Sequence, residues 1–161
     1  MINRYRLLLS IQEQYKLNWQ GTHGIDHWLR VLDNGIKLQA AHLDANLEVI
    51  ELFAILHDSR RLNEWTDDGH GRRGADFAAT LRGEYFNLRD HDFDMLYYAI
   101  DRHSDGLIDG DITVRTCWDA DRLDLGRVGI KPDAKYLCTD AGKLIANTGG
   151  YNGIKRYDSG R

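Results

Sequence analysis

A histidine and an aspartate stand side by side, His57-Asp58, directly after the most apolar stretch of the chain, Val49–Leu56. Seven of the eight residues in that stretch are apolar, which is typical of a buried helix. Burying a carboxylate costs on the order of several kcal/mol unless a cation or hydrogen bonds offset the cost. Imidazole and carboxylate are also ligands for divalent metal ions. The pair therefore indicates either a metal site or the polar end of a core helix.

Three further residues of the same chemistry fall on other expected helices. His27 lies at the edge of the apolar face expected for residues 25–43, and His103 continues the helical stripe of residues 93–100 by one step. Asp121 is a carboxylate within an apolar stripe and needs a partner. Taken singly, each histidine could be a surface residue or a hydrogen-bonded core residue, and Asp121 could be an isolated carboxylate. Together with His57 and Asp58 they make five such residues on four helices, which favours a metal site inside a helix bundle. The neighbouring Asp119 and Asp124 fall off this stripe, and we expect them to be solvated.

Helical periodicity dominates the chain and predicts an all-α fold, a compact bundle of about six or seven helices. Asn46 is a suitable N-cap for the helix that leads to His57. The other expected helices are residues 3–18, 25–43, 72–86, 90–102 and 112–130, with a last helical stretch opening at Pro132. The inner face expected for residues 25–43 comprises Ile25, Trp28, Leu29, Leu32 and Ile36. We expect one domain over residues 1–146 and a flexible tail over 147–161, which is rich in glycine and polar residues.

The composition narrows the class of protein. At 161 residues, with 42% hydrophobic and 29% charged residues, the chain is typical of one globular domain. Its net charge of −4 gives no support for a nucleic-acid-binding surface. Two cysteines, Cys117 and Cys138, do not form a disulfide framework and fit a reduced, cytoplasmic setting. The hydrophobic run near the N-terminus is too short, and its surroundings are too polar, for a signal peptide or a membrane span. We therefore expect no membrane association.

Three motifs in order resemble the HD superfamily of metal-dependent phosphohydrolases. The superfamily has a histidine early in one helix, a His-Asp pair on a later helix and a distal aspartate. These correspond to IDHWLRV with His27, AILHDSRR with His57 and Asp58, and DADRLDL with Asp121. The resemblance covers roughly residues 20–130. It implies an HD-type helical domain in which these four residues bind at least one divalent metal ion.

A subset of that superfamily holds two metal ions and uses two more histidines between the His-Asp pair and the last aspartate. GHGRRGADFA with His70 and AIDRHSDG with His103 are similar to those positions. The step from His103 to Asp121 is also similar to that of bacterial diadenosine tetraphosphate hydrolases. The loop before His70 is shorter than in those relatives. The GYP signature of cyclic di-GMP phosphodiesterases is absent from the corresponding stretch, HSDGLIDGD.

The resemblance implies a reaction. Asp58 would act as the catalytic residue by bridging two metal ions that activate water for attack on phosphorus. Nitrogen and oxygen ligands suit Fe, Mn, Co, Ni or Zn, and the sequence does not choose among these metals. Arg61 occupies the place of a basic residue in many relatives, and we expect it to bind substrate phosphate. Alternatives for that role are Arg60, Arg72, Arg73 and Arg122. His23, one turn before His27, has no assigned role.

Three functions are compatible with these residues. The first is a phosphohydrolase acting on a nucleotide or other small phosphorylated metabolite. The second is an HD-type diiron oxygenase, which would use the same ligands and differ in iron dependence and oxygen consumption. The third is a sensory or regulatory protein that binds metal without turnover. Retention of every expected ligand favours an enzyme, and the sequence leaves the oligomeric state open.

Overall fold

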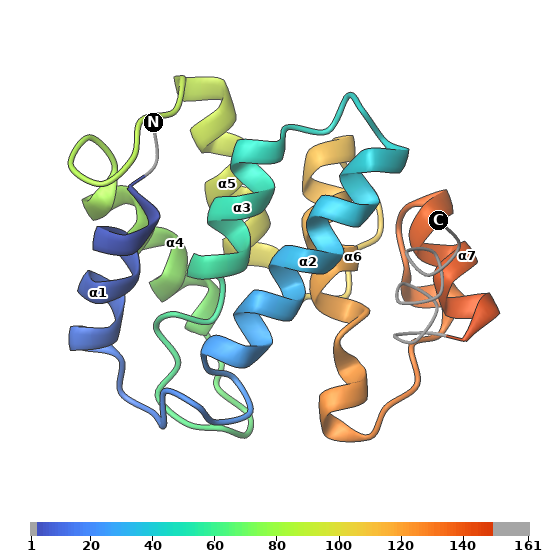
Figure 1. Cartoon of the computed structure of the whole chain (residues 1–161), viewed down its shortest axis with the longest axis horizontal. Helices are drawn as coiled ribbons and strands as arrows, with labels where there is room; N and C mark the ends of the chain where they lie inside the picture. The colour runs from blue at the N-terminus through green and yellow to red at the C-terminus, as the bar shows by residue number, and fades with distance from the viewer. Residues whose placement is uncertain (1–2, 150–161) are drawn as a thin grey trace.

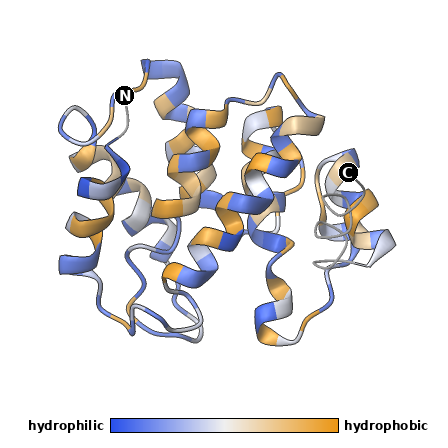
Figure 2. Cartoon of the chain, viewed as in Figure 1, coloured by the Kyte–Doolittle hydropathy of each residue, from blue (hydrophilic) through white to orange (hydrophobic). Residues whose placement is uncertain are grey.

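The computed structural model describes residues 3–149, which form seven α-helices and two short 3₁₀ helices but no β-strand. This confirms the all-α fold (Figure 1). Hydrophobic residues recur along the helices, whereas the loops between helices are mainly hydrophilic (Figure 2). In chain order the elements are α1 (Arg4–Gln14), α2 (Ile25–Ala41), α3 (Leu47–Leu56), α4 (His70–Leu81), α5 (Asp90–Arg102), α6 (Ile112–Arg122), η1 (Leu125–Val128), η2 (Ala134–Tyr136) and α7 (Asp140–Thr148).

Helix α3 is the centre of the core, in contact with α2, α5 and α6. Seven of its ten residues are buried, as its nearly continuous apolar sequence predicts. Asn46 caps the helix as expected, since its side-chain oxygen accepts hydrogen bonds from the backbone N–H groups of Glu48 and Val49. The helix ends at Leu56, so the next two residues, His57 and Asp58, are delivered to the interior of the molecule.

The inner face of α2 differs from the prediction. Trp28 is buried as predicted, but Leu29 and Ile36 are 51% and 44% exposed, and the buried face also includes Val31 and Leu38. Gly35 lies at its middle, where an added Cβ would collide with the side chain of Ile50 on α3. A glycine contributes nothing to a hydrophobic pattern, although here its lack of a side chain leaves room for Ile50 of α3. The predicted face followed the large apolar residues and therefore missed the side of α2 that carries Gly35.

Two glycines bring α4 against the ends of α3 and α5. A Cβ on Gly71 would lie 2.6 Å from the carbonyl oxygen of Asp101, and one on Gly74 would lie 3.1 Å from that of His57. Only glycine permits such close backbone approach. As a result His70, the first residue of α4, lies next to the end of α5. The predicted helix at residues 72–86 thus begins two residues earlier and ends at Leu81.

The region after α5 departs most from the expected pattern. The predicted helix over residues 112–130 ends at Arg122, and Val128 is 46% exposed. Pro132 does not open a helix, since the next elements are η2 and then α7, which begins after its N-cap Thr139. Helix α7 continues past the predicted start of the tail at Asn147, and residues 150–161 lie outside the described residues.

Asp119 was expected to be solvated, which is wrong: it is fully buried. Its carboxylate accepts hydrogen bonds from the backbone N–H groups of Cys138 and Thr139 and from the Thr139 hydroxyl, at 2.7–2.8 Å. These bonds tie α6 to the start of α7. Both cysteines are buried free thiols. Among residues 3–149, no helix is both long and apolar enough to cross a membrane.

Candidate metal centre

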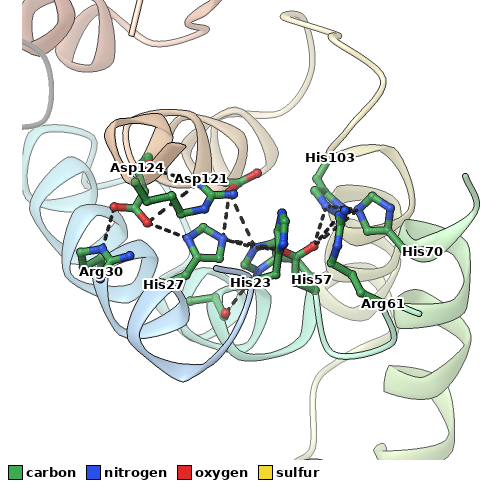
Figure 3. A network of polar contacts seen from close by, with 12 residues as sticks. His23, His27, Arg30, His57, Arg61, His70, His103, Asp121 and Asp124 are labelled. Atoms are coloured by element: carbon green, nitrogen blue, oxygen red, sulfur yellow. Dashed lines mark hydrogen bonds and ion pairs between the residues drawn. The ribbon is translucent and has the colours of Figure 1, made fainter. Parts of the chain in front are cut away.

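Five helices contribute to one polar cluster in the interior. His27 lies in the first turn of α2, His70 opens α4, and Asp121 lies in the last turn of α6. His57 and His103 are the residues that immediately follow α3 and α5. Side chains at helix ends can reach one another where the ends converge, and Figure 3 shows these residues pointing toward a common centre. The structure therefore brings together all six residues predicted as ligands: His27, His57, Asp58, His70, His103 and Asp121.

The first group of ligand atoms comes from His27, His57 and Asp121, together with one oxygen of Asp58. The Nε2 atoms of His27 and His57 are 3.0 Å apart. The Oδ1 atom of Asp121 lies 3.3 Å from Nε2 of His27 and 3.7 Å from Nε2 of His57. Oδ2 of Asp58 is 3.5 Å from each of the two imidazole nitrogens.

The second group lies on the other side of Asp58. Nε2 of His70 and Nε2 of His103 are 2.9 Å apart, and Oδ1 of Asp58 is 3.4 Å from the first and 3.5 Å from the second. One oxygen of Asp58 thus faces each group. Such a shared carboxylate is the geometry expected of a bridging ligand between two metal positions.

Hydrogen bonds outside the cluster fix which nitrogen of three histidines carries the proton. Nδ1 of His57 lies 3.2 Å from the carbonyl oxygens of Phe53 and Ala54. Nδ1 of His70 lies 2.7 Å from the carbonyl of Asp67, and Nδ1 of His103 lies 2.7 Å from that of Ile100. A carbonyl oxygen only accepts, so each Nδ1 donates. In the neutral form, the Nε2 atoms that face Asp58 therefore carry lone pairs.

This arrangement fits a metal ion. Nε2 lone pairs and carboxylate oxygens converge, and Oδ1 of Asp58 is buried without a hydrogen-bond partner among residues 3–149. Converging acceptors repel one another unless a proton or a cation lies between them. Nitrogen and oxygen donors without thiolate suit the middle first-row divalent metals. Both groups could therefore hold a divalent metal ion.

The pKa shifts of the metal-free site also indicate that positive charge is favoured there. Burial alone would lower the pKa of His27, but hydrogen bonds to Asp121, Asp124 and Asp58 raise it to about 10. Burial lowers the pKa of His57 to about 4. For Asp58, the effect of burial is outweighed by the adjacent His57 and by His103 and His27, whose Nε2 atoms each lie 3.5 Å from its carboxylate, and these imidazoles hold its pKa well below its usual range. A proton on His27 thus partly neutralises the carboxylates.

Arg61 borders the second group. Its Nε and Nη2 donate to the carbonyl oxygens of Asn63 and Trp65, at 3.3 and 2.7 Å. Its Nη1 donates to Nε2 of His70 at 3.1 Å and lies 3.5 Å from Oδ1 of Asp58. One nitrogen of the guanidinium therefore faces the ligand cluster, while the other two hold the loop that precedes α4.

The alternative arginines are engaged with other groups. Arg60 lies over the ring of Phe77, Arg72 pairs with Asp101, Arg73 pairs with Asp67, and Arg122 donates to the carbonyl of Tyr136. His23 pairs with Glu64, with 2.5 Å between Nδ1 and Oε2. This contact joins the loop before α2 to the loop that carries Arg61, and the His23 ring lies 6.4 Å from that of His27.

Asp124 is the residue of this site that sequence reasoning missed. It was expected in solvent, yet it is 1% exposed, and its Oδ2 lies 2.6 Å from Nδ1 of His27. The prediction is wrong because α6 ends at Arg122, and the turn into η1 directs Asp124 back toward α2. The signal available in the sequence was its place in DADRLDL, three residues after Asp121.

Comparison with known proteins gives one informative match. No protein-family model matches the sequence, and no curated protein matches it significantly. The crystal structure of a predicted HD superfamily hydrolase from an uncultured Thermotogales bacterium is similar, with a TM-score of 0.69 and 24% sequence identity. The alignment covers 98% of this chain and 91% of that one. The chain therefore has the fold of that predicted HD superfamily hydrolase, which is the fold that the motifs around His27, His57-Asp58 and Asp121 predicted.

Proposed function

We propose that this protein is a metal-dependent phosphohydrolase that acts on a nucleotide or another small phosphorylated metabolite. The observation that carries the proposal is the pair of ligand groups that share Asp58. His27 and His57, beside Asp121, face one of its oxygens, and His70 and His103 face the other. The HD-type motifs of the sequence and the hydrolase name of the structural neighbour also support it.

The ligands would be divided between two metal positions. His27, His57, Asp58 and Asp121 would hold one divalent ion, and Asp58, His70 and His103 would hold a second. Divalent ions bound there would lower the pKa of a water molecule and polarise phosphate oxygens. The buried Nδ1–H contacts of the histidines keep their Nε2 lone pairs aimed at the centre. Five of the six side chains are buried, and burial strengthens electrostatic interactions among them.

Arg61 is our candidate for the phosphate-binding side chain. Its Nη1 faces the second group, and hydrogen bonds to two backbone carbonyls hold the guanidinium in place. A fixed cation at this edge would stabilise negative charge on a phosphate without reorganisation during the reaction. Since Nε and Nη2 are already engaged, the contact would use one nitrogen rather than the two-nitrogen fork common for arginine.

The test begins with metal analysis of protein purified without chelators, followed by assays with nucleotides and dinucleoside polyphosphates. We expect phosphate release that depends on a divalent metal and is abolished in Asp58→Asn, which keeps the shape of the side chain and removes its charge. Asp94→Asn, an exposed aspartate on α5, is the matched control and should retain activity. Dioxygen uptake with no phosphate release from any substrate would overturn the proposal in favour of the diiron oxygenase.

A further inference from the structure

We propose that Asp124 is a positioning residue of the metal centre, which holds His27 with Nδ1 protonated and Nε2 aimed at the other ligands. Arg30 in turn holds Asp124. The inference rests on the proposed metal site and adds a residue that lies outside the set of ligands. Figure 3 shows Asp124 between Arg30 and His27, with a dashed contact to each.

Both oxygens of Asp124 contact α2, and Nη1 of Arg127 in η1 also lies 3.9 Å from Oδ2. Oδ2 lies 2.6 Å from Nδ1 of His27, and Oδ1 accepts a hydrogen bond from Nε of Arg30 at 2.8 Å. His27 and Arg30 are three residues apart and so lie on the same side of the helix. The carboxylate is 1% exposed, which means that water does not compete for either contact.

His27 differs from the other histidines of the cluster in the acceptor that its Nδ1 contacts. The other three histidines donate from Nδ1 to carbonyl oxygens three or four residues earlier in the chain. His27 is the third residue of α2, so the corresponding carbonyls belong to Gly24 and His23, before the helix. The Gly24 carbonyl accepts from the N–H of Trp28, and the His23 carbonyl accepts from the hydroxyl of Tyr15. Nδ1 of His27 instead contacts the carboxylate of Asp124, so its acceptor comes from a distant part of the chain.

A charged acceptor has a chemical consequence that a carbonyl does not have. A carboxylate that accepts from Nδ1–H fixes the tautomer of a ligating histidine and raises the basicity of Nε2. An ion pair that merely tied α2 to the turn after α6 would need Arg30 and Asp124 alone. The 2.6 Å contact to a ligand nitrogen is what separates positioning from simple cross-linking.

The experiment compares Asp124→Asn with a matched control, Asp92→Asn. Asp92 is also buried and also bound by an arginine, with 2.8 Å between Nε of Arg89 and Oδ2, but this pair lies at the start of α5. Zinc affinity is measured by chelator competition, and the His27 ring is observed by ¹H–¹⁵N NMR. We expect Asp124→Asn to weaken zinc binding by about 10–100-fold and to remove the downfield Nδ1 proton resonance of His27, with both unchanged in Asp92→Asn.

A second variant covers the case in which Asp124→Asn does not fold. Arg30→Lys keeps the carboxylate but loosens its hold, and it should weaken zinc binding in the same direction. Zinc affinity within twofold of the wild type in the folded variants, with an unchanged Nδ1 resonance, would overturn the inference. This failure is distinct from failure of the proposed function, in which the wild type would bind zinc through His27 and release phosphate from no substrate.

Discussion

Nε2 of His27 and Nε2 of His57 lie 3.0 Å apart, although 30 residues separate them in the chain. His57 donates from Nδ1 to backbone carbonyls, and Nδ1 of His27 faces the carboxylate of Asp124. With both Nδ1 atoms protonated, the two Nε2 lone pairs point at each other unless a cation lies between them. The raised pKa of His27 supplies a proton for that purpose in the metal-free protein. A metal ion would replace this proton and satisfy both nitrogens.

The number of metal ions should follow the two groups of ligand atoms. We expect the wild type to bind two divalent ions and His103→Ala to bind one, because the substitution removes a ligand from the second group alone. Metal analysis after loading and desalting gives the stoichiometry. His91→Ala, an exposed histidine on α5, is the control and should still bind two. A wild type that takes up one ion under every loading condition would contradict the second position.

The stability of the metal-free protein should be greatest near pH 6.5. The pKa of His27 is raised to about 10, above its unfolded value of about 6.5, so its contribution is full below about pH 6.5 and is lost as the pH rises toward 10. The pKa of His57 is lowered to about 4, so its contribution is full above about pH 6.5 and is lost as the pH falls toward 4.

Urea unfolding with a chelator present, repeated across this pH range, measures the effect as the free energy of unfolding. The variant His27→Gln should lose the decline on the alkaline side, while the decline on the acid side remains. A wild-type stability that rises steadily from pH 6.5 to pH 9 would show that His27 does not hold its proton.

Arg61→Lys should reduce activity even though it keeps the charge. Lysine cannot donate to the carbonyls of Asn63 and Trp65 and to the ligand cluster at the same time, as the guanidinium does. Loss of a charge-assisted contact to phosphate corresponds to about 1.5–3 kcal/mol, which is roughly a ten- to hundredfold decrease in kcat/KM. The measurement is steady-state kinetics on a substrate identified in the assays with nucleotides and dinucleoside polyphosphates. Arg60→Lys, at the adjacent position over the Phe77 ring, is the control. If the kcat/KM of Arg61→Lys equals that of the wild type, Arg61 does not have this role.

Asp119→Asn should lower stability without changing metal affinity. The substitution weakens the hydrogen bonds from Cys138 and Thr139 that join α6 to α7, and loss of a hydrogen bond to a charged group costs about 1.5–3 kcal/mol. Chemical unfolding measures the first effect and zinc competition the second. The exposed Asp94→Asn should change neither. A loss of zinc affinity equal to that of Asp124→Asn would mean that Asp119 acts on the site as well.

The all-α fold and all six candidate ligands could be predicted from the sequence. The apolar run before His57 and the stripe that leads to His103 are local patterns, and burial of one helix face follows directly from such periodicity. The N-cap at Asn46 is local as well, because it depends only on the residues beside it. Asp121 was also marked by its place in an apolar stripe, whereas recognition of His70 relied on the resemblance to a family, since a histidine in a polar loop carries little information alone.

The tertiary structure decided how the ligands are grouped and what holds them. That Asp58 faces two groups depends on where the ends of five helices meet, and close approach at Gly35 and Gly71 sets that meeting without any signal in a hydrophobic pattern. Asp124 reaches His27 across 97 residues only because α6 stops at Arg122 and the chain turns. Periodicity encodes the burial of a face, but the point at which a helix ends and the partner its next residue meets are settled by contacts between distant parts of the chain.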